Sequence, residues 1–412
     1  MGENGGFGKK LSLILGGLDD LKESINVVAG GLDGLKSDVN DLKSGIDSVK
    51  ENISGIKSGM GDMKKGINSI DTLKDSLGGV LAGVGEMTSG LTGLKDDVSS
   101  INEELPTGTV ENSVAEGMRS TMGKSDALRD EGLTTPEDIE RFDDIVYGPD
   151  AEQEKLDIYR LKASRNEDGS FKMLPVIVSV HGGAWLYGSR VQYQFYCMSL
   201  AQRGFAVINF DYRLAPEYKF PASLEDVCLV FDWLARHGSE YGLDTENIIV
   251  VGDSAGGHLA GLYACMYTDP EFAAVYGFSI PEGICIRAMG LNCGAYDPNR
   301  YMSERELWSG IIAEDKSILD TDQLNVTDHM NDKFPPTYLM SATGDFCFKY
   351  FDPMLKCLEK HGIEAESRVY GNEENKLGHV FHLNVRSSDA QECNDNECSF
   401  FKKILGEDCG NV

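Results

Sequence analysis

Basic residues are few in this sequence of 412 residues. Lysine and arginine together number 38 against 67 aspartates and glutamates, which gives a formal net charge of −29 at pH 7. A protein that binds nucleic acid needs a surface of clustered positive charge, and anionic membrane surfaces attract basic segments for the same reason. We therefore expect neither a nucleic-acid partner nor attachment to an anionic membrane surface.

A long hydrophobic run is also missing. The apolar segment Leu11–Leu18 is interrupted by Ser12 and by two glycines, and two aspartates follow it. A helix that crosses a bilayer needs about 20 predominantly apolar residues. The sequence therefore predicts no membrane span.

Cysteine pairs with the Cys-x-x-Cys spacing of redox and metal motifs are absent. Ten cysteines are present, and several lie in apolar stretches, as Cys228 does. This distribution is typical of reduced thiols that fill a core, so we expect a cytoplasmic protein, with a surface-associated or secreted one as the alternative. A disulfide or metal cluster among the last three cysteines is another interpretation, but no histidine accompanies them at ligand spacing. We expect no metal and no organic cofactor.

Residues 1–112 lack most of the residue types that build a globular core. They hold one aromatic residue (Phe7), one proline (Pro106) and no cysteine or histidine, yet they hold 21 of the 47 glycines. Their 11 lysines face 18 acidic residues. Nearly all aromatic residues lie in the remainder of the chain. Two physically different segments therefore share this sequence.

The N-terminal segment does have a regular spacing of apolar side chains. Over residues 11–105 they recur at alternating intervals of three and four, with one shift near Ile70. A period of 3.5 residues held over this length is typical of a left-handed coiled coil. Glycine repeatedly precedes the a position, which resembles the Leu-x-x-Gly heptad repeats of some bacterial surface and membrane-associated proteins. We expect a coiled-coil stalk over residues 1–105 that makes the protein a homo-oligomer, with a monomeric hairpin near Gly78 and Gly79 as the alternative.

From about residue 140 the pattern changes to short β-branched runs that alternate with helical segments. This alternation predicts an α/β domain with a mostly parallel sheet flanked by helices. The expected strands are Ile145–Tyr147, Lys155–Leu161, Leu174–Val180, Ala206–Tyr212, Asn247–Gly252, Ala288–Asn292, Thr337–Ser341 and Glu366–Tyr370. The expected helices are Val191–Arg203, Ser223–His237, Gly256–Tyr267, Tyr350–His361 and Asp389–Leu405. A further short helix is expected to begin at Thr135, because Pro136 follows it in the arrangement of an N-cap.

The most informative stretch is an apolar strand followed directly by a Gly-x-Ser-x-Gly motif and a helix. The motif is Gly252-Asp253-Ser254-Ala255-Gly256. A nucleophile elbow requires this order of elements. Small residues at positions 252 and 256 let the backbone turn sharply and leave the Ser254 hydroxyl accessible, and the helix N-terminus offers N–H groups to a developing oxyanion. An ordinary tight turn between strand and helix is the alternative.

A second signal follows the expected strand Leu174–Val180. The chain continues there as His181-Gly182-Gly183-Ala184-Trp185. Two glycines at a strand end allow N–H groups to face a ligand oxygen, so we expect the amides of Gly182, Gly183 and Ala255 to form an oxyanion hole. We expect His181 to fix the loop by a hydrogen bond rather than to act as a base. A bare Gly-Gly turn is the alternative.

Three segments together resemble the α/β-hydrolases of the hormone-sensitive-lipase-like and BD-FAE-like esterase group. They are His181–Trp185, Asp211–Glu217 and Gly252–Gly257, and the resemblance covers about residues 140 to 406. It implies an α/β-hydrolase fold in which Asp211, Arg213 and Glu217 belong to the scaffold. The expected organisation is a coiled-coil stalk over residues 1–105, a linker with cap helices over residues 106–140, and an α/β-hydrolase catalytic domain over residues 141–412.

The acid of a catalytic triad follows the serine in this fold and the histidine comes last. The acid should end a late strand, and the segment that ends at Asp345 resembles the family's strand-Ser-Ala-x-x-Asp segment. Asp345 is therefore the expected acid, with a plain helix N-cap as its alternative role. Asp352 is the second candidate, but we expect it to lie inside the next helix.

The histidines that follow Asp345 are His361, His379 and His382. His361 lies at an expected helix end, where a cation is favourable. His379 lies in a segment that resembles the family's His-x-Phe loop, so it is the expected base, and His382 is the second candidate. Val380 departs from the family pattern, which frequently has glycine at that position.

These residues predict a serine carboxylesterase. In this interpretation Ser254 attacks an ester carbonyl, His379 takes its proton, and Asp345 holds the imidazole. We expect Trp185 and Asp253 to bind the substrate, a short-chain acyl ester that includes acetylated carbohydrates among its candidates.

The pocket wall is expected to come from residues 113–140 and from an insert between Pro298 and Pro335. The insert's candidate wall residues are Tyr301, Trp308 and Met330, with simple packing onto the domain as the alternative. Three other functions stay open: an arylformamidase, a longer-chain lipase on the same scaffold, and a non-catalytic binding or assembly module.

Overall fold

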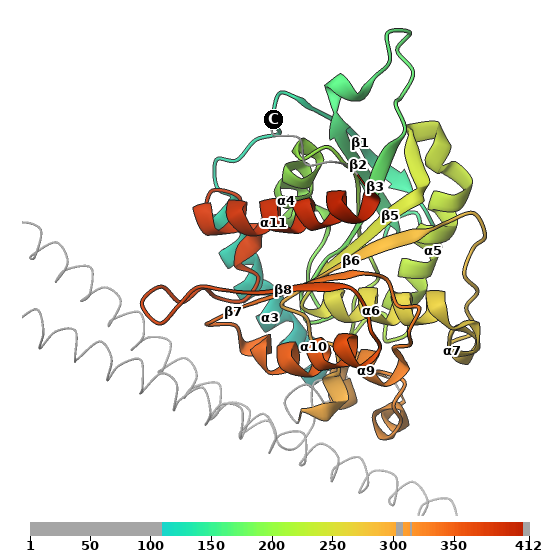
Figure 1. Ribbon diagram of the computed structural model, residues 1–412. Coiled ribbons are helices and arrows are strands. Elements are labelled where there is room, and N and C mark those ends of the chain that lie inside the picture. The colour runs from blue at the N-terminus through green and yellow to red at the C-terminus, as the bar shows by residue number, and fades with distance from the viewer. Residues whose placement is uncertain (1–108, 302–307, 314, 407–412) are drawn as a thin grey trace, which may run out of the picture. The chain divides into compact units, whose positions relative to one another are not determined.

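A computed structural model describes residues 109–301, 308–313 and 315–406 (Figure 1). The expected coiled-coil stalk over residues 1–105, and the homo-oligomer that it would form, lie outside these residues. No helix in the described ranges has both the length and the apolar character that a membrane span needs.

The centre of the fold is an eight-stranded sheet with the strand order β1-β2-β4-β3-β5-β6-β7-β8. β1 and β2 pair antiparallel, β2 and β4 pair antiparallel, and all the remaining neighbours are parallel. The strands are β1 Ile139–Val146, β2 Lys155–Leu161, β3 Leu174–Val180, β4 Ala206–Phe210, β5 Leu243–Asp253, β6 Ile286–Asn292, β7 Thr337–Ala342 and β8 Ala365–Tyr370. The mostly parallel sheet that the sequence predicts is therefore confirmed.

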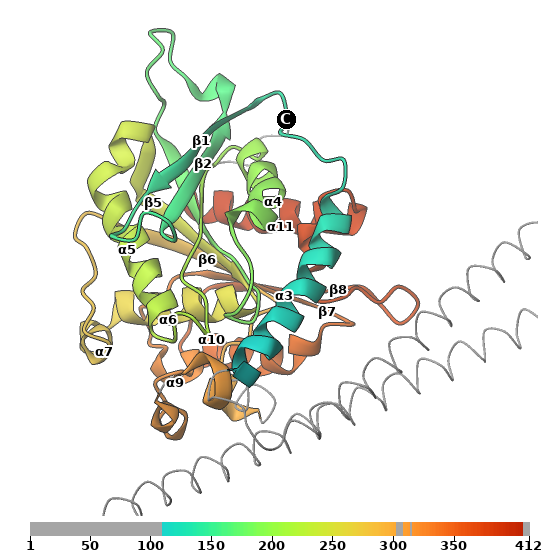
Figure 2. The ribbon, with the colours of Figure 1, turned by 180° about the vertical axis from the view of Figure 1, so that it is seen from behind.

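Helices cover both faces of the sheet (Figures 1 and 2). α4 and α11 supply apolar side chains to the core on one face, and α5, α6 and α10 supply them to the core on the other. The helices are α3 Thr109–Asp130, α4 Arg190–Gln202, α5 Ala222–His237, α6 Ala255–Thr268, α7 Pro270–Val275, α9 Val326–His329, α10 Phe351–Lys360 and α11 Ser388–Leu405. Burial on both faces explains why β3 and residues 248–252 of β5 are almost wholly apolar.

The short helix expected at Thr135 does not form. The N–H of Ile139 instead closes a turn on the carbonyl of Pro136, at 3.1 Å, and β1 begins at Ile139. The carbonyl of Asp138 also accepts a hydrogen bond from the N–H of Lys162, at 2.8 Å, which ties this segment to the end of β2. Pairing with the sheet therefore outweighs the local N-cap signal.

The segment expected to be a linker with cap helices contains a long helix, α3, which packs on the domain (Figure 2). The Arg119 guanidinium donates to the carbonyls of Leu186 and Ala215, at 2.7 and 2.9 Å, and to the Glu217 carboxylate at 2.7 Å. Asp126 accepts a hydrogen bond from the Tyr187 hydroxyl at 2.9 Å. These contacts join α3 to the loops that follow β3 and β4.

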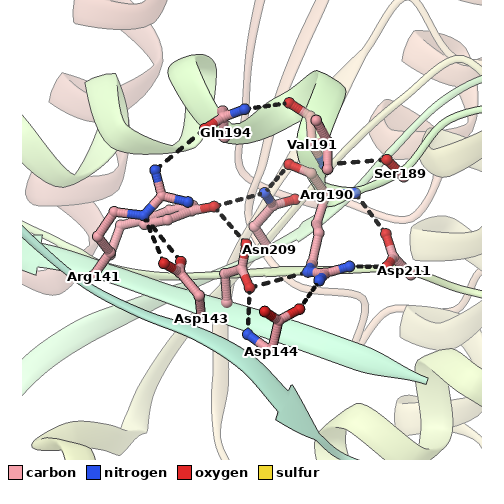
Figure 3. Close-up of polar contacts among 11 residues, drawn as sticks. Arg141, Asp143, Asp144, Ser189, Arg190, Val191, Gln194, Asn209 and Asp211 are labelled. Carbon is pink, nitrogen blue, oxygen red and sulfur yellow. Dashed lines mark hydrogen bonds and ion pairs between the residues drawn. The ribbon is translucent and has the colours of Figure 1, made fainter. Parts of the chain in front are cut away.

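An arginine at the start of α4 joins several elements near the sheet edge. Arg190 is paired with Asp144 and Asp211 (Figure 3), and it also lies 3.0 Å from Asp157 on β2. The side chain of Asp211 accepts a further hydrogen bond from the Arg190 N–H at 2.7 Å. These contacts fit the scaffold role expected for Asp211, and they fix the N-terminal end of α4, which carries Tyr193.

Candidate active site

The Gly-x-Ser-x-Gly segment forms a sharp turn between β5 and α6. Ser254 has φ 52° and ψ −120°, a conformation that residues other than glycine rarely adopt. A Cβ at Gly252 would lie 2.4 Å from the Gly256 carbonyl oxygen, and a Cβ at Gly256 would lie 2.0 Å from the carbonyl oxygen of Val180. Only glycine fits at either position, so the motif is explained by the close approach of the backbones.

The structure brings Ser254, His379 and Asp345 into one chain of hydrogen bonds. His379 Nε2 lies 2.9 Å from Ser254 Oγ, and His379 Nδ1 lies 2.6 Å from Asp345 Oδ1. Ser254 and Asp345 are buried, while the side chain of His379 is 17% exposed. The three residues come from the end of β5, the segment after β7 and the segment after β8.

The Asp345 carboxylate has two hydrogen-bond partners besides His379. Its carboxylate accepts hydrogen bonds from the Ser341 hydroxyl at 2.7 Å and from the Cys347 N–H at 2.8 Å. The second bond caps the 3-10 helix Phe346–Tyr350, so the N-cap role weighed from the sequence and the contact with His379 occur together. Burial opposes ionisation, but His379 and these donors outweigh it, so the pKa of Asp345 lies below its ordinary value.

The other candidate acid and bases lie elsewhere. Asp352 is in the first turn of α10, and His361 follows the last residue of that helix, as expected. His382 is fully buried, and neither of its ring nitrogens has a hydrogen-bond partner among the described residues. Burial, together with the nearby His379, lowers the pKa of His382 to about 3. A neutral, enclosed imidazole without contact to Ser254 does not suit a general base.

The loop of His379 shows why glycine would be frequent beside it. Val380 has φ 50° and ψ 34°, in the left-handed region. A β-branched residue is strained there, whereas glycine is not. This chain nevertheless adopts the turn with valine and keeps the His379 ring against Asp345.

The oxyanion hole expected from the sequence needs one correction. The Gly182 N–H donates to the Tyr193 hydroxyl at 2.9 Å, so that amide is already engaged. Gly183 and Ala184 follow in a turn with φ 120° and 53°, and both line the cavity beside Ser254. Neither of these two amides donates to another group in the part of the chain that the structure describes. The candidate donors in this loop are therefore Gly183 and Ala184.

His181 fixes the loop, as the sequence analysis expects. Its Nδ1 lies 2.7 Å from the Gly182 carbonyl oxygen, and its ring stacks on Tyr212 with centroids 4.0 Å apart. Burial lowers the pKa of His181 to about 4, which keeps the imidazole neutral. It does not contact Ser254.

A cavity of about 630 Å³ opens beside Ser254 and His379. Trp185 and Asp253, the expected substrate-binding residues, both contribute to its wall but are only 3% exposed. Burial, opposed by a hydrogen bond from Tyr193, raises the pKa of Asp253 to about 7. Their role in substrate binding stays a prediction.

The rest of the wall agrees with one of the two expected sources. Met118 and Met122 of α3 line the cavity, as predicted for residues 113–140. The insert residues Tyr301, Trp308 and Met330 are not among the described residues that line it, and Trp308 instead packs behind Trp185 with ring centroids 4.9 Å apart. Phe346, which was not singled out from the sequence, also lines the cavity. The residue is 66% exposed, and its ring centroid lies 4.0 Å from that of the His379 ring. Its position directly after the candidate acid is a signal that would have suggested it.

The fold and this site define the class of protein: the α/β-hydrolase fold with a serine, a histidine and an aspartate in contact. Solved structures agree with the fold. Esterase B from Lactobacillus rhamnosis has a TM-score of 0.65 at 24% sequence identity, over 72% of this chain and 96% of its own. An esterase from Pyrobaculum calidifontis has a TM-score of 0.56 at 21% identity, over 73% of this chain and 99% of its own.

Sequence comparisons find similarity to esterases over part of the chain. The sequence model of the BD-FAE family matches residues 156–347. Esterase LipC of Mycobacterium tuberculosis is 36% identical over 140 residues, which are 34% of this chain and 32% of that protein. Tuliposide A-converting enzyme 1 of Tulipa gesneriana is 28% identical over 234 residues, which are 53% of this chain and 59% of that protein. The chain thus spans between one third and three fifths of the length of these curated relatives.

Proposed function

We propose that this protein is a carboxylic ester hydrolase whose nucleophile is Ser254. The observation that carries the proposal is the hydrogen-bond chain from Ser254 Oγ through the His379 ring to Asp345. The BD-FAE match and the relatives that are named esterases support the same class of reaction.

The geometry suits acyl transfer. His379 Nε2 accepts the Ser254 proton as the oxygen attacks the ester carbonyl, and the same proton then goes to the leaving alcohol. Asp345 stays ionised because its pKa is lowered, so it keeps the Nδ1–H tautomer of His379 and stabilises the imidazolium. Water then attacks the acyl-enzyme with His379 as the base.

The oxyanion that forms in each step needs N–H donors. The Ala255 N–H is the first of α6, where no carbonyl within the helix can accept it. We propose that it acts together with the Gly183 and Ala184 amides as the donors to the oxyanion. Each such donor typically contributes about 3–4 kcal/mol of transition-state stabilisation.

The substrate class that we propose is a short-chain acyl ester, with acetylated carbohydrates among the candidates. The cavity of about 630 Å³ lies toward the middle of the range of small-molecule sites, and Met118, Met122 and Leu383 give part of it an apolar wall. A series of p-nitrophenyl esters from acetate to decanoate, with acetylated xylan beside it, tests this choice. A maximum of kcat/KM at octanoate or decanoate would indicate a lipase instead.

Replacement of the nucleophile tests the reaction itself. Ser254→Ala should lower p-nitrophenyl acetate hydrolysis by at least a thousandfold, because loss of a triad nucleophile removes most of the rate enhancement. Ser399→Ala, which changes an exposed serine on α11, is the matched control and should keep the wild-type rate. If the folded Ser254→Ala variant keeps more than about a tenth of the activity, the proposed function is wrong.

A further inference from the structure

A thiol lies directly behind the candidate triad. Cys293 follows β6 and is 1% exposed. Three potential ligand atoms, one each from Cys293, Asp345 and His379, lie within 4.8 Å of one another. Cys293 is not among the residues that line the cavity, whereas His379 is. The thiol therefore contacts the triad without forming part of the cavity wall.

The Cys293 thiol is surrounded by a polarizable sulfur atom as well as by ionisable groups. Cys293 Sγ lies 3.9 Å from the sulfur of Met340 on the neighbouring strand β7. Asp345 adds a carboxylate, and His379 adds an imidazole whose Nδ1 already faces that carboxylate. A thiolate, an imidazole and a carboxylate are the three ligand types that proteins use for Zn²⁺.

We propose that Cys293, Asp345 and His379 form an inhibitory binding site for a thiophilic divalent cation, of which Zn²⁺ and Cd²⁺ are the probes. The thiolate and the carboxylate together balance the charge of such an ion. Three protein ligands leave the fourth tetrahedral position to water, an arrangement known from open zinc sites. Hard cations such as Mg²⁺ prefer oxygen ligands and should not compete.

The distances are close to those that a metal requires. Zn–S and Zn–N bonds of about 2.3 and 2.0 Å place tetrahedral ligand atoms roughly 3.5 Å apart. His379 Nδ1 and Asp345 Oδ1, now 2.6 Å apart, must therefore separate by about 1 Å, whereas a pair at the outer limit of 4.8 Å must close by about 1 Å.

Binding of the cation changes two protons. The Cys293 S–H bond breaks, its proton goes to solvent, and a metal–sulfur bond forms. The Nδ1 lone pair of His379 binds the metal, and the proton of the neutral imidazole moves from Nδ1 to Nε2.

The shifted proton explains the inhibition. Nε2, which lies 2.9 Å from Ser254 Oγ, is the nitrogen that must accept the serine proton. Once Nε2 carries a proton and Nδ1 is bound to metal, neither nitrogen can act as a base. Because Cys293 does not line the cavity, the cation should affect substrate binding little, so kcat should fall while KM stays constant.

The kinetic test uses the full chain and rests on the proposed function for its activity. Zn²⁺ should lower the kcat for p-nitrophenyl acetate at least tenfold without a change in KM, EDTA should restore it, and Mg²⁺ should have no effect. In Cys293→Ser the Zn²⁺ concentration for half inhibition, measured against that variant's own metal-free rate, should rise at least tenfold. Cys285→Ser, which removes a thiol elsewhere in the fold, is the matched control and should be inhibited like the wild type. Equal inhibition of Cys293→Ser, or inhibition through KM alone, would overturn the site.

A second test needs no activity. Cd²⁺ bound to a thiolate gives an ultraviolet charge-transfer band, and we expect one such site per chain in the wild type, in Cys285→Ser and in the inactive Ser254→Ala. His379→Ala, which leaves the buried thiol in place, should need a higher Cd²⁺ concentration for half saturation. If that concentration equals the wild-type value, the site is wrong whether or not Cys293→Ser folds. If Ser254→Ala binds Cd²⁺ while no ester is hydrolysed by the wild type, the proposed function fails and the site stands.

Discussion

Tyr193 is the residue that connects the loop after β3 with the serine turn. Its hydroxyl accepts a hydrogen bond from the Gly182 N–H at 2.9 Å and donates one to Asp253 at 2.7 Å. Tyr193 is almost fully buried, and its hydroxyl joins both partners at the wall of the cavity. It therefore sets the position of the backbone from which the Gly183 and Ala184 amides face Ser254.

Removal of this hydroxyl should damage both the fold and the site. We expect Tyr193→Phe to destabilise the protein by about 1–3 kcal/mol, since it leaves a buried N–H and a buried carboxyl without their partner. The kcat for p-nitrophenyl acetate should fall by about tenfold, because a shift of the oxyanion donors weakens transition-state binding. Thermal unfolding and steady-state kinetics measure the two effects. Tyr218→Phe, at a partly exposed ring, is the control, and equal melting temperatures of the two variants would contradict this role.

Most of the chemistry at the residue scale could be predicted from the sequence. The Gly-x-Ser-x-Gly motif and the order of serine, acid and histidine led to Ser254, Asp345 and His379, and the structure places these side chains in contact. The error concerned Gly182. Its motif shows two adjacent glycines, but a tyrosine on another element decides which amide is already hydrogen-bonded, and no local pattern reports that contact.

At the scale of elements, α3 is the least expected feature. It runs beside the cavity and places Met118 and Met122 in the wall. Arg119 carries much of its attachment, because one guanidinium binds two carbonyls and the Glu217 carboxylate. Charge-assisted hydrogen bonds of this kind are stronger than neutral ones. The cavity wall therefore depends on contacts made by Arg119, which directly follows the wall residue Met118.

Loosening of α3 should affect substrate binding more than chemistry. Arg119→Ala should raise KM for p-nitrophenyl butyrate by about tenfold, the factor that corresponds to ~1.4 kcal/mol of lost attachment, with kcat changed less than threefold. Lys124→Ala removes an exposed cation from the same helix and should leave KM unchanged. Equal KM values for the two variants would show that α3 does not shape the occupied cavity.

The bounds of the helices and strands could be predicted from the sequence in some places and not in others. The bounds of β2 and β3 agree with the expected ones. In β3 a nearly continuous apolar run marks a strand that is buried on both faces. β1 begins six residues earlier than expected, since an edge strand tolerates polar residues, and a bulge with Asp144 at φ 60° interrupts it. The helix expected at Thr135 failed because pairing with the end of β2 decides the conformation there.

At the scale of the whole molecule, buried carboxyl groups oppose stability at high pH. Burial raises the pKa of Asp226, Asp253 and Glu397, in the last two to about 7. Between their ordinary values and about 7, the folded state holds protons that the unfolded state has released. The contribution of these groups to the free energy of unfolding therefore falls as pH rises through this range.

Buried histidines act in the opposite sense over much of the same range. Burial lowers the pKa of His181 and His258 to about 4, and that of His382 to about 3. As pH falls from about 6.5, these histidines bind protons in the unfolded state but stay neutral in the folded state. The free energy of unfolding therefore decreases as the pH falls. The two sets therefore offset one another in part between about pH 4 and 6.5.

Substitution of one buried carboxyl group should reveal how much its ionisation contributes to the pH dependence of stability. Glu397 is fully buried on α11 and accepts a hydrogen bond from Asn292 at 2.8 Å. Glu397→Gln cannot ionise, so its melting temperature relative to the wild type should increase from pH 5 to pH 8, by about 2–4 °C for each kcal/mol that ionisation costs. Glu392→Gln, an exposed substitution on the same helix, should show a difference that does not vary with pH. A constant difference for Glu397→Gln would contradict the raised pKa.

The most direct test of the candidate active site is covalent labelling of the full chain with a fluorophosphonate, followed by mass spectrometry of its peptides. An activated serine should take up one label per chain at Ser254, and the folded Ser254→Ala variant should take up none. Labelling that is undiminished in Ser254→Ala, or a folded wild-type protein that takes up no label, would contradict the assignment of Ser254 as the nucleophile.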